Sequence, residues 1–152
     1  MRPHDARYNA LPLQGHPQLD ARINYVATRS PISDPFARYN NALANGRQDM
    51  ADRHHVYFKH FNDIKEGNPQ LILERSEAVE LPPMLVMQGG LDDNVLPALQ
   101  VKFGESYRAA SGECEVAIFE GCDHLWVLEP GPDTDRAHET VKAFIANQLR
   151  RA

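Results

Sequence analysis

Three short apolar runs, each bounded by proline or glycine, stand out along the chain. They are PPMLVMQG at 82–89, ECEVAIFEG at 113–121, and a shorter stretch at 22–28 that ends before Pro31. The run at 82–89 is continuously apolar, which is typical of a strand buried on both faces, as in a parallel sheet. We therefore predict three strands at these positions.

Helical spacing of apolar residues follows the second and third runs. Residues 96–110 place apolar side chains three or four positions apart, and a similar stripe runs from Ala137 to Leu149. Between the first and second runs, from about 35 to 80, the composition is helical but polar, with a predicted break at Gly46. Strand, helical excursion, strand, helix, strand and helix is an α/β order, with right-handed crossovers onto a parallel sheet.

Composition and charge narrow the class of protein. A chain of 152 residues has the size of one domain, so 35–80 is treated as an insertion within it. The net charge of −5 argues against a nucleic-acid-binding protein, which would carry a basic face. The sequence has no signal-like apolar leader and no run of about 20 apolar residues. We therefore expect no membrane span and a cytoplasmic location.

The two cysteines flank the third apolar run. Cys114 lies at its start and Cys122 follows it. An extended strand holds its ends far apart, so we predict two reduced thiols and no disulfide. A nucleophilic pair of Cys122 with His124 is a weaker alternative, because closeness in sequence is not what such a pair requires.

Two loops carry the candidate chemistry. Asp92 and Asp93 follow the second predicted strand, and GCDHLW brings His124 directly after the third. In a parallel sheet the carboxyl ends of neighbouring strands meet at one edge, so these loops are predicted to be neighbours. A carboxylate beside an imidazole holds the ring in one tautomer while the ring acts as a general base.

Three segments resemble the α/β-hydrolase superfamily, of the esterase and lipase type. PPMLVMQGGLDDNVLP resembles its acid-bearing segment, VAIFEGCDHLWV its last strand and catalytic-histidine loop, and TRSPISDP the strand end after its nucleophile helix. The resemblance extends over most of the chain and implies a partial α/β-hydrolase fold. That fold would contain the last three parallel strands, their flanking helices and a cap-like insertion at about 35–80.

The resemblance also implies roles for individual residues. Asp92 would be the catalytic acid, because Gly89 precedes it by three residues, and His124 would be the general base. Asp93, one residue out of register, would cap the turn or the following helix. The implied function is the C-terminal portion of a serine-dependent carboxylic-ester hydrolase that acts on a small-molecule ester and needs no cofactor. A portion of a prolyl-oligopeptidase-like peptidase, or a non-catalytic binding domain, remains open.

The nucleophile of that family is missing from the sequence. There is no Gly-x-Ser-x-Gly elbow and no His-Gly-Gly loop. The serines are Ser30, Ser33, Ser76, Ser106 and Ser111. We expect the nucleophile to lie upstream of Met1 and this chain to be inactive alone. The first predicted strand would then be an unpaired edge, which favours self-association.

Two further groups of side chains have alternative interpretations. A His-rich stretch lacks the i, i+4 histidine pair of a zinc helix, so we predict a solvated helical face and no metal site. Its members are Asp49, Asp52, His54, His55 and His60. Four aromatic residues could line an acyl pocket or could pack the cap, and substrate-binding residues stay unassigned. They are Tyr39, Phe58, Phe61 and Trp126.

Overall fold

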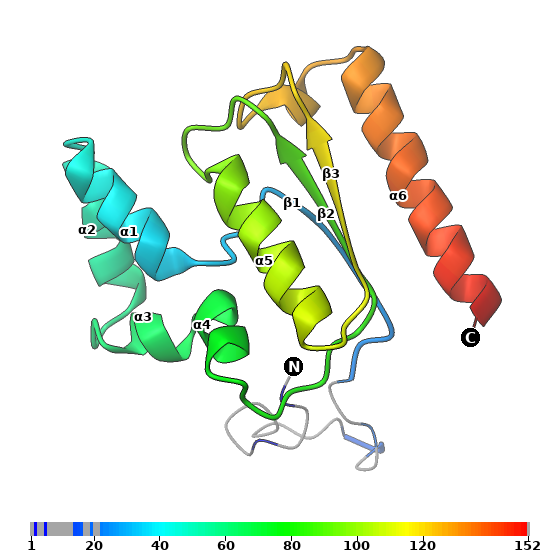
Figure 1. Ribbon diagram of the computed structural model, residues 1–152, viewed down its shortest axis with the longest axis horizontal. Coiled ribbons are helices and arrows are strands. Elements are labelled where there is room, and N and C mark those ends of the chain that lie inside the picture. Colours follow the sequence, from blue (N-terminus) through cyan, green and yellow to red (C-terminus); the bar gives the residue numbers. More distant parts are fainter. Residues whose placement is uncertain (1, 3–4, 6–13, 17–18, 20–21, 152) are drawn as a thin grey trace.

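A three-stranded parallel sheet forms the centre of the computed structural model, which describes residues 2, 5, 14–16, 19 and 22–151. The strands are β1 (Val26–Arg29), β2 (Met84–Gly89) and β3 (Cys114–Phe119), in the order β1-β2-β3. All three run in the same direction (Figure 1). The predicted α/β class is confirmed.

Four helices separate β1 from β2, and one helix follows each of the other strands. They are α1 (Pro35–Ala44), α2 (Gln48–Tyr57), α3 (Asp63–Glu66), α4 (Pro69–Glu74), α5 (Pro97–Ala109) and α6 (Pro132–Arg151), with a 3-10 turn, η1, at Trp126–Leu128. Gly46 takes a φ of +66°, which few side chains tolerate, and separates α1 from α2 as predicted. Asn68 caps α4 by accepting a hydrogen bond from the Leu71 N–H, and Pro69 then occupies the first turn.

The sheet is covered on both faces. Leu85 and Phe119 belong to a core cluster that includes Phe144 of α6, whereas Val116 points toward α5. A Cβ on Gly104 would lie 2.4 Å from Val116 Cγ2, so α5 packs unusually close to β3 at that glycine. Figure 1 shows α5 and α6 on opposite sides of the sheet, with α1 to α4 grouped beyond α5. β2 is therefore buried on both faces, as its unbroken apolar run predicts.

The first strand is shorter than predicted and begins later. The sequence predicted 22–28, whereas β1 covers Val26–Arg29 and Ile23 is exposed. The Val26 N–H donates to the Pro83 carbonyl, 2.9 Å away, at the start of the ladder. Proline has no N–H, so Pro82 and Pro83 cannot donate hydrogen bonds to the carbonyl groups of residues before Val26. The β1–β2 ladder therefore begins at Val26.

β1 occupies one edge of the described sheet. The N–H groups of Val26 and Ser30 point toward β2, where they donate to the Pro83 and Met87 carbonyls. Because backbone groups alternate along a strand, those of Ala27 point away from β2. The exposed Ala27 therefore presents its N–H and C=O at the open edge.

Both cysteines are free thiols, as predicted. Cys114 is half-buried and Cys122 is buried. Burial raises the pKa of both thiols, and for Cys122 the neighbouring carboxylate of Asp133 adds to the effect. A thiol with a raised pKa is a poor nucleophile, which disfavours the Cys122–His124 alternative. Separately, none of the described helices is long and apolar enough to cross a membrane.

Candidate active site

Asp92 lies in the turn that follows β2 and is almost completely buried. Its Oδ1 accepts hydrogen bonds from the Asn94 N–H (2.9 Å) and the Val95 N–H (2.8 Å). Its Oδ2 accepts from Gln88 Nε2 (2.9 Å) and lies 2.8 Å from His124 Nδ1. Both oxygens therefore accept two hydrogen bonds each, and the carboxylate is held on all sides.

These hydrogen bonds determine the charge of Asp92. Burial alone would raise the pKa of Asp92, but donors from Val95, His124 and Gln88 outweigh it and hold the pKa below its ordinary value. Asp92 is therefore a buried, ionised carboxylate at neutral pH.

His124 follows β3 and faces Asp92 across the gap between the two strand ends. An ionised carboxylate only accepts hydrogen bonds, so Nδ1 of His124 donates to Asp92, and in the neutral ring Nε2 then carries the lone pair. The side chain is 27% exposed, and Nε2 makes no hydrogen bond within the described part of the chain. Arg29 Nη1 donates to the backbone oxygen of His124 at 2.6 Å and ties this loop to β1. The contact to Asp92 therefore orients a ring that remains partly exposed.

Two glycines let the acid loop and the histidine loop touch. A Cβ on Gly89 would lie 2.4 Å from the Asp123 carbonyl oxygen, and one on Gly90 would lie 2.7 Å from the Glu120 carbonyl oxygen. The Leu91 N–H also donates to the Cys122 carbonyl at 2.9 Å. Neither glycine has a positive φ, so the requirement is close backbone approach and not an unusual conformation.

Asp93 does not have the capping role that the sequence suggested. Asp92 itself accepts the two N–H groups of the turn, and α5 begins after Leu96 without a side-chain cap. The exposed Asp93 instead pairs with Arg47, which lies 3.5 Å from Asp93 Oδ2 and donates to the Asp93 carbonyl at 2.8 Å. The Asn94 and Val95 N–H groups are therefore already bonded to Asp92 and are not free for a second carboxylate.

Gln88 is a site residue that sequence analysis missed. Its Nε2 lies within 3.1 Å of three oxygens, those of Gly89, Asp92 and Val95, so the amide nitrogen must point toward the turn. Gln88 is completely buried, and its Oε1 has no hydrogen-bond partner among the described residues. One signal in the sequence could have identified Gln88: it is the one amide side chain in the apolar run at 84–89. A buried amide needs hydrogen-bond partners, which points to polar groups close by.

Arg38 of α1 is a second residue that the sequence did not reveal. Its Nε and Nη2 donate to Asn94 Oδ1, at 3.2 Å and 2.5 Å, and Asn94 in turn donates its backbone N–H to Asp92. The two hydrogen bonds from Arg38 to Asn94 and the contacts between Arg47 and Asp93 attach the α1–α2 insertion to the loop that carries Asp92. No local sequence pattern marks a contact that spans 56 residues.

No serine of the chain hydrogen-bonds to His124. Ser30 follows β1 with a φ of +43°, and both it and Ser33 are buried with hydroxyls that have no partner among the described residues. Ser106 lies on α5 and accepts a hydrogen bond from Gln70. The geometry supplies an acid and a base, without a nucleophile bonded to them.

The His-rich stretch is not the uniformly solvated face that was predicted. His54 is buried, with Nδ1 donating to the Met50 carbonyl at 2.8 Å, while His55 is exposed beside Tyr39. The inward turn of His54 follows from helix geometry, since adjacent residues point about 100° apart. No cluster of three or more potential metal ligands occurs among the described residues.

The four candidate pocket aromatics have different positions. Trp126 is buried and stacks on Phe119 with ring centroids 4.4 Å apart, so it belongs to the core on the α6 side. Tyr39 packs on Phe61 at 4.6 Å within the insertion. Only Phe58 borders one of the described cavities, between α1 and α2. For Trp126 and Tyr39 the packing alternative therefore fits better than an acyl pocket.

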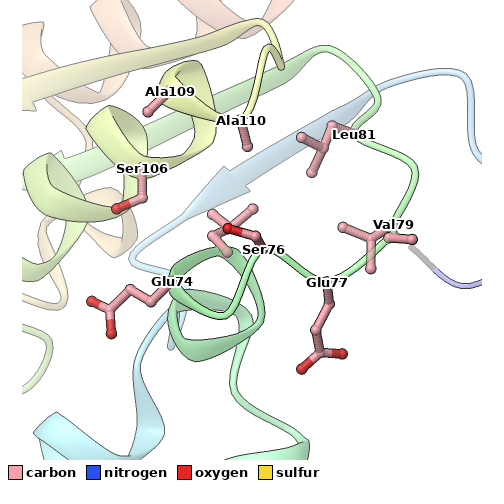
Figure 2. A pocket seen from close by; sticks show the side chains of 10 residues that line it. Glu74, Ser76, Glu77, Val79, Leu81, Ser106, Ala109 and Ala110 are labelled. Carbon is pink, nitrogen blue, oxygen red and sulfur yellow. The ribbon is translucent and has the colours of Figure 1, made fainter.

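A second cavity, of about 480 Å³, lies away from these loops (Figure 2). Leu81 precedes β2, and Ala109 and Ala110 end α5, so this cavity is at the amino-terminal end of the sheet. Its two carboxylates already have basic partners: Glu74 pairs with Lys102 and Glu77 with Arg75. It is separate from the Asp92–His124 pair, which lies at the carboxyl ends of the strands.

Comparison with known proteins agrees with this fold. Residues 24–152 match the model of the prolyl oligopeptidase family. A solved structure of a butyrate-bound esterase, Est2, from the planctomycete Thermogutta terrifontis is similar, with a TM-score of 0.63 and 19% sequence identity. The match covers 89% of this chain and 47% of that chain, so this sequence spans less than half the length of that esterase. A search of curated proteins gave no match. The three parallel strands and their helices are a partial α/β-hydrolase fold, as the sequence resemblance implied.

Proposed function

The chain belongs to the prolyl oligopeptidase family, and on that premise we propose that it supplies the acid and the base of a serine-dependent hydrolase. Asp92 is the acid and His124 is the general base. The nucleophilic serine would come from sequence outside these 152 residues. The substrate would be a small carboxylic ester, and the protein would need no cofactor.

The hydrogen bond between Asp92 and His124 is the observation that carries this proposal. It joins a buried, ionised carboxylate to Nδ1 and leaves Nε2 as an accessible base. A structural aspartate in a turn needs no imidazole partner, and a loop histidine needs no buried carboxylate. Each residue alone has an ordinary structural explanation, whereas the pair at two adjacent strand ends fits general-base catalysis.

The arrangement implies a sequence of proton transfers. Nε2 of His124 would take the proton from the serine hydroxyl as that oxygen attacks the ester carbonyl. The same nitrogen would then return the proton to the departing alcohol, and it would repeat both transfers with water to release the acid and restore the serine. Asp92 would stay ionised throughout and stabilise the charged imidazole, which its low pKa favours. Gln88 would hold Oδ2 of Asp92 in place during both steps.

Peptide-bond hydrolysis is the second candidate function. The family model favours it, because that family is described by a peptidase activity. The similarity to a butyrate-bound esterase favours a short acyl ester. The acid–base pair would serve either reaction, since both pass through a tetrahedral intermediate and require a protonated leaving group.

Labelling with a fluorophosphonate tests the proposal. The natural protein that contains this sequence would be captured with an antibody against the α6 segment, labelled, and digested for mass spectrometry. We expect one labelled serine outside residues 1–152, with labelling lost in Asp92→Asn and His124→Gln. Absence of labelling in the unaltered protein, or label on Ser30, would contradict the proposal. Rates on p-nitrophenyl butyrate and on a prolyl p-nitroanilide would then separate the two substrate classes.

We also propose that the 152-residue chain self-associates through the open edge of β1. The N–H and C=O of Ala27 point to that edge and have no backbone partner among the described residues, and such an edge pairs readily with another strand. In Ala27→Pro the outward N–H is removed while the β1–β2 ladder keeps its hydrogen bonds. Sedimentation should show oligomers for the unaltered chain and a shift toward monomer for Ala27→Pro. A monodisperse unaltered monomer would contradict this.

A further inference from the structure

A cavity of about 360 Å³ opens beside α1 and α2. Tyr57, Phe58 and Ile32 supply apolar surface to its lining, and Arg38, Arg53 and His54 supply polar groups. Its size is within the range of small-molecule sites. Tyr57 and Ile32 remain largely exposed, so this surface is open to a ligand from solvent.

Arg38 brings a positive charge into this cavity and forms no direct ion pair with a carboxylate among the described residues. Its hydrogen-bond partners are all uncharged: the backbone and side-chain oxygens of Asn94, and Nε2 of His54 at 3.2 Å. A half-buried guanidinium stays charged. The Asp92 carboxylate acts on it without contact, whereas Arg47 and Arg53 add two positive charges nearby, so the local field is positive.

His54 adds a neutral acceptor and not a second charge. Its Nδ1 donates to the Met50 carbonyl, so its Nε2 accepts the hydrogen bond from Arg38. Burial lowers the pKa of His54, and the positive charge of Arg38 lowers it further. The hydrogen bond to the Met50 carbonyl raises this pKa, but the net shift is downward. The positive charge of the cavity wall therefore comes from arginine at neutral pH.

The donor count of Arg38 leaves room for an anion. A guanidinium has five N–H donors. Three are used, one each on Nε, Nη1 and Nη2, which leaves two by subtraction. Arg53 lines the same cavity, with a side chain that is 80% exposed and only a long 3.5 Å contact to Asp49 on its own helix. Such an exposed pair is weak, so Arg53 can turn toward a ligand.

We propose that this cavity binds a small organic carboxylate with an aromatic or similarly apolar body. The carboxylate would take the two remaining donors of Arg38, with Arg53 as a second cation, and the apolar body would lie against Tyr57 and Phe58. A carboxylate matches the charge and the fork geometry of a guanidinium. The aromatic rings match a flat apolar group. This ligand site is distinct from the Asp92–His124 pair, and it stands independently of the proposed hydrolase function.

The site is connected to the acid loop. Arg38 holds the Asn94 side chain, and the Asn94 N–H donates to Asp92. An anion bound to Arg38 would therefore alter the environment of Asn94. We expect ligand binding to shift the Asn94 amide resonance along with those of Arg38 and Tyr57, and to leave the distant Ala109 resonance unchanged.

Binding of phenylacetate to the 152-residue chain tests the proposal. Phenylacetamide is the matched neutral control, since it keeps the ring and loses the charge. Nuclear magnetic resonance titration up to about 10 mM covers the millimolar affinity of a weak ligand. We expect phenylacetate to shift the Arg38 and Tyr57 resonances, and phenylacetamide to bind at least about tenfold more weakly. Equal binding of the two ligands, or no shift with either, would overturn the proposal.

Variants separate the cavity from a general charge effect. Arg53→Gln removes a cavity cation from an exposed position, and Arg108→Gln makes the same charge change on α5. We expect phenylacetate affinity to fall about threefold or more in Arg53→Gln and to stay unchanged in Arg108→Gln. Arg38→Gln should abolish binding while the circular dichroism spectrum stays native. If Arg38→Gln unfolds the chain, the comparison of Arg53→Gln with Arg108→Gln still tests the proposal. Equal phenylacetate affinities in these two variants would contradict the site.

Discussion

The acid loop and the histidine loop are held in different ways. Asp92 is 2% exposed and both of its oxygens accept two hydrogen bonds, so the carboxylate has one position. The His124 side chain is 27% exposed, and its ring is held through Nδ1 alone. The proposed mechanism needs a fixed acid beside a less constrained base, since that base would have to reach two different oxygens in turn. Changes at the two loops should therefore have unequal effects on stability.

The largest loss of stability is expected from Asp92→Ala. This change leaves the buried donors of Val95 and Gln88 without an acceptor, and each unsatisfied group costs roughly 1–3 kcal/mol. We expect a total of about 3 kcal/mol or more in urea unfolding. Asp93→Ala is the matched control: its side chain is exposed, so a change within about 0.5 kcal/mol is expected. Equal losses in the two variants would show that the acid loop is not held by Asp92.

Gly89→Ala should come next, because it forces the two loops apart. The new Cβ would lie 2.4 Å from the Asp123 carbonyl and 2.6 Å from that of Cys122, both of them backbone atoms. Overpacking of this kind costs about 1–3 kcal/mol. A Cβ on Gly121 meets nothing within 4 Å, so Gly121→Ala is the control and should be close to neutral. Thermal unfolding of both variants measures the difference, and a neutral Gly89→Ala would mean that the loops are not in contact.

Acid should weaken the acid loop selectively. The folded pKa of Asp92 lies below its unfolded value, so its contribution to stability is present above the unfolded pKa and is lost as pH falls through the folded pKa. Below about pH 4, the ordinary range of aspartate, the unaltered chain should lose stability faster than Asp92→Asn. Urea midpoints measured for both proteins between neutral pH and about pH 3 would show the two curves converging. Parallel curves would mean that Asp92 is not stabilised as an anion.

Apart from the control variants, the smallest effect on stability is expected from His124→Ala. The ring is partly exposed and its Nε2 has no partner among the described residues, so the loss should stay near or below about 1 kcal/mol. In the natural protein, the same variant should lose hydrolysis by about 100-fold or more, the lower bound for a general base. Substitution of His124 should thus reduce activity strongly and stability little, whereas substitution of Asp92 should reduce both. A large loss of stability would assign His124 a structural role.

The sequence carried enough information for the sheet and for the closeness of Asp92 and His124. The run at 84–89 is apolar because β2 is buried on both faces, and such burial leaves an unmistakable pattern. Asp92 and His124 could be paired because parallel strands bring their carboxyl ends to one edge, whatever the details of packing. Both inferences depend on topology alone.

Other features depended on partners that no local pattern identifies. The start of β1 was misplaced because the ladder is limited by Pro82 and Pro83, which lie far along the chain from Val26. The inward turn of His54 and the fork from Arg38 to Asn94 appear only once α1 and α2 pack near the acid loop. Polar contacts between distant segments leave no periodicity in the sequence, so they were invisible at that level.

The tautomer of His124 is the most direct test of the central claim. Long-range ¹H–¹⁵N spectra of the 152-residue chain at alkaline pH distinguish a ring protonated on Nδ1 from one protonated on Nε2. If Asp92 orients His124 for catalysis, Nδ1 carries the proton in the unaltered chain, and Asp92→Ala shifts the ring toward the other tautomer. A proton on Nε2 in the unaltered chain would contradict the account, because the nitrogen meant to act as the base would then be occupied.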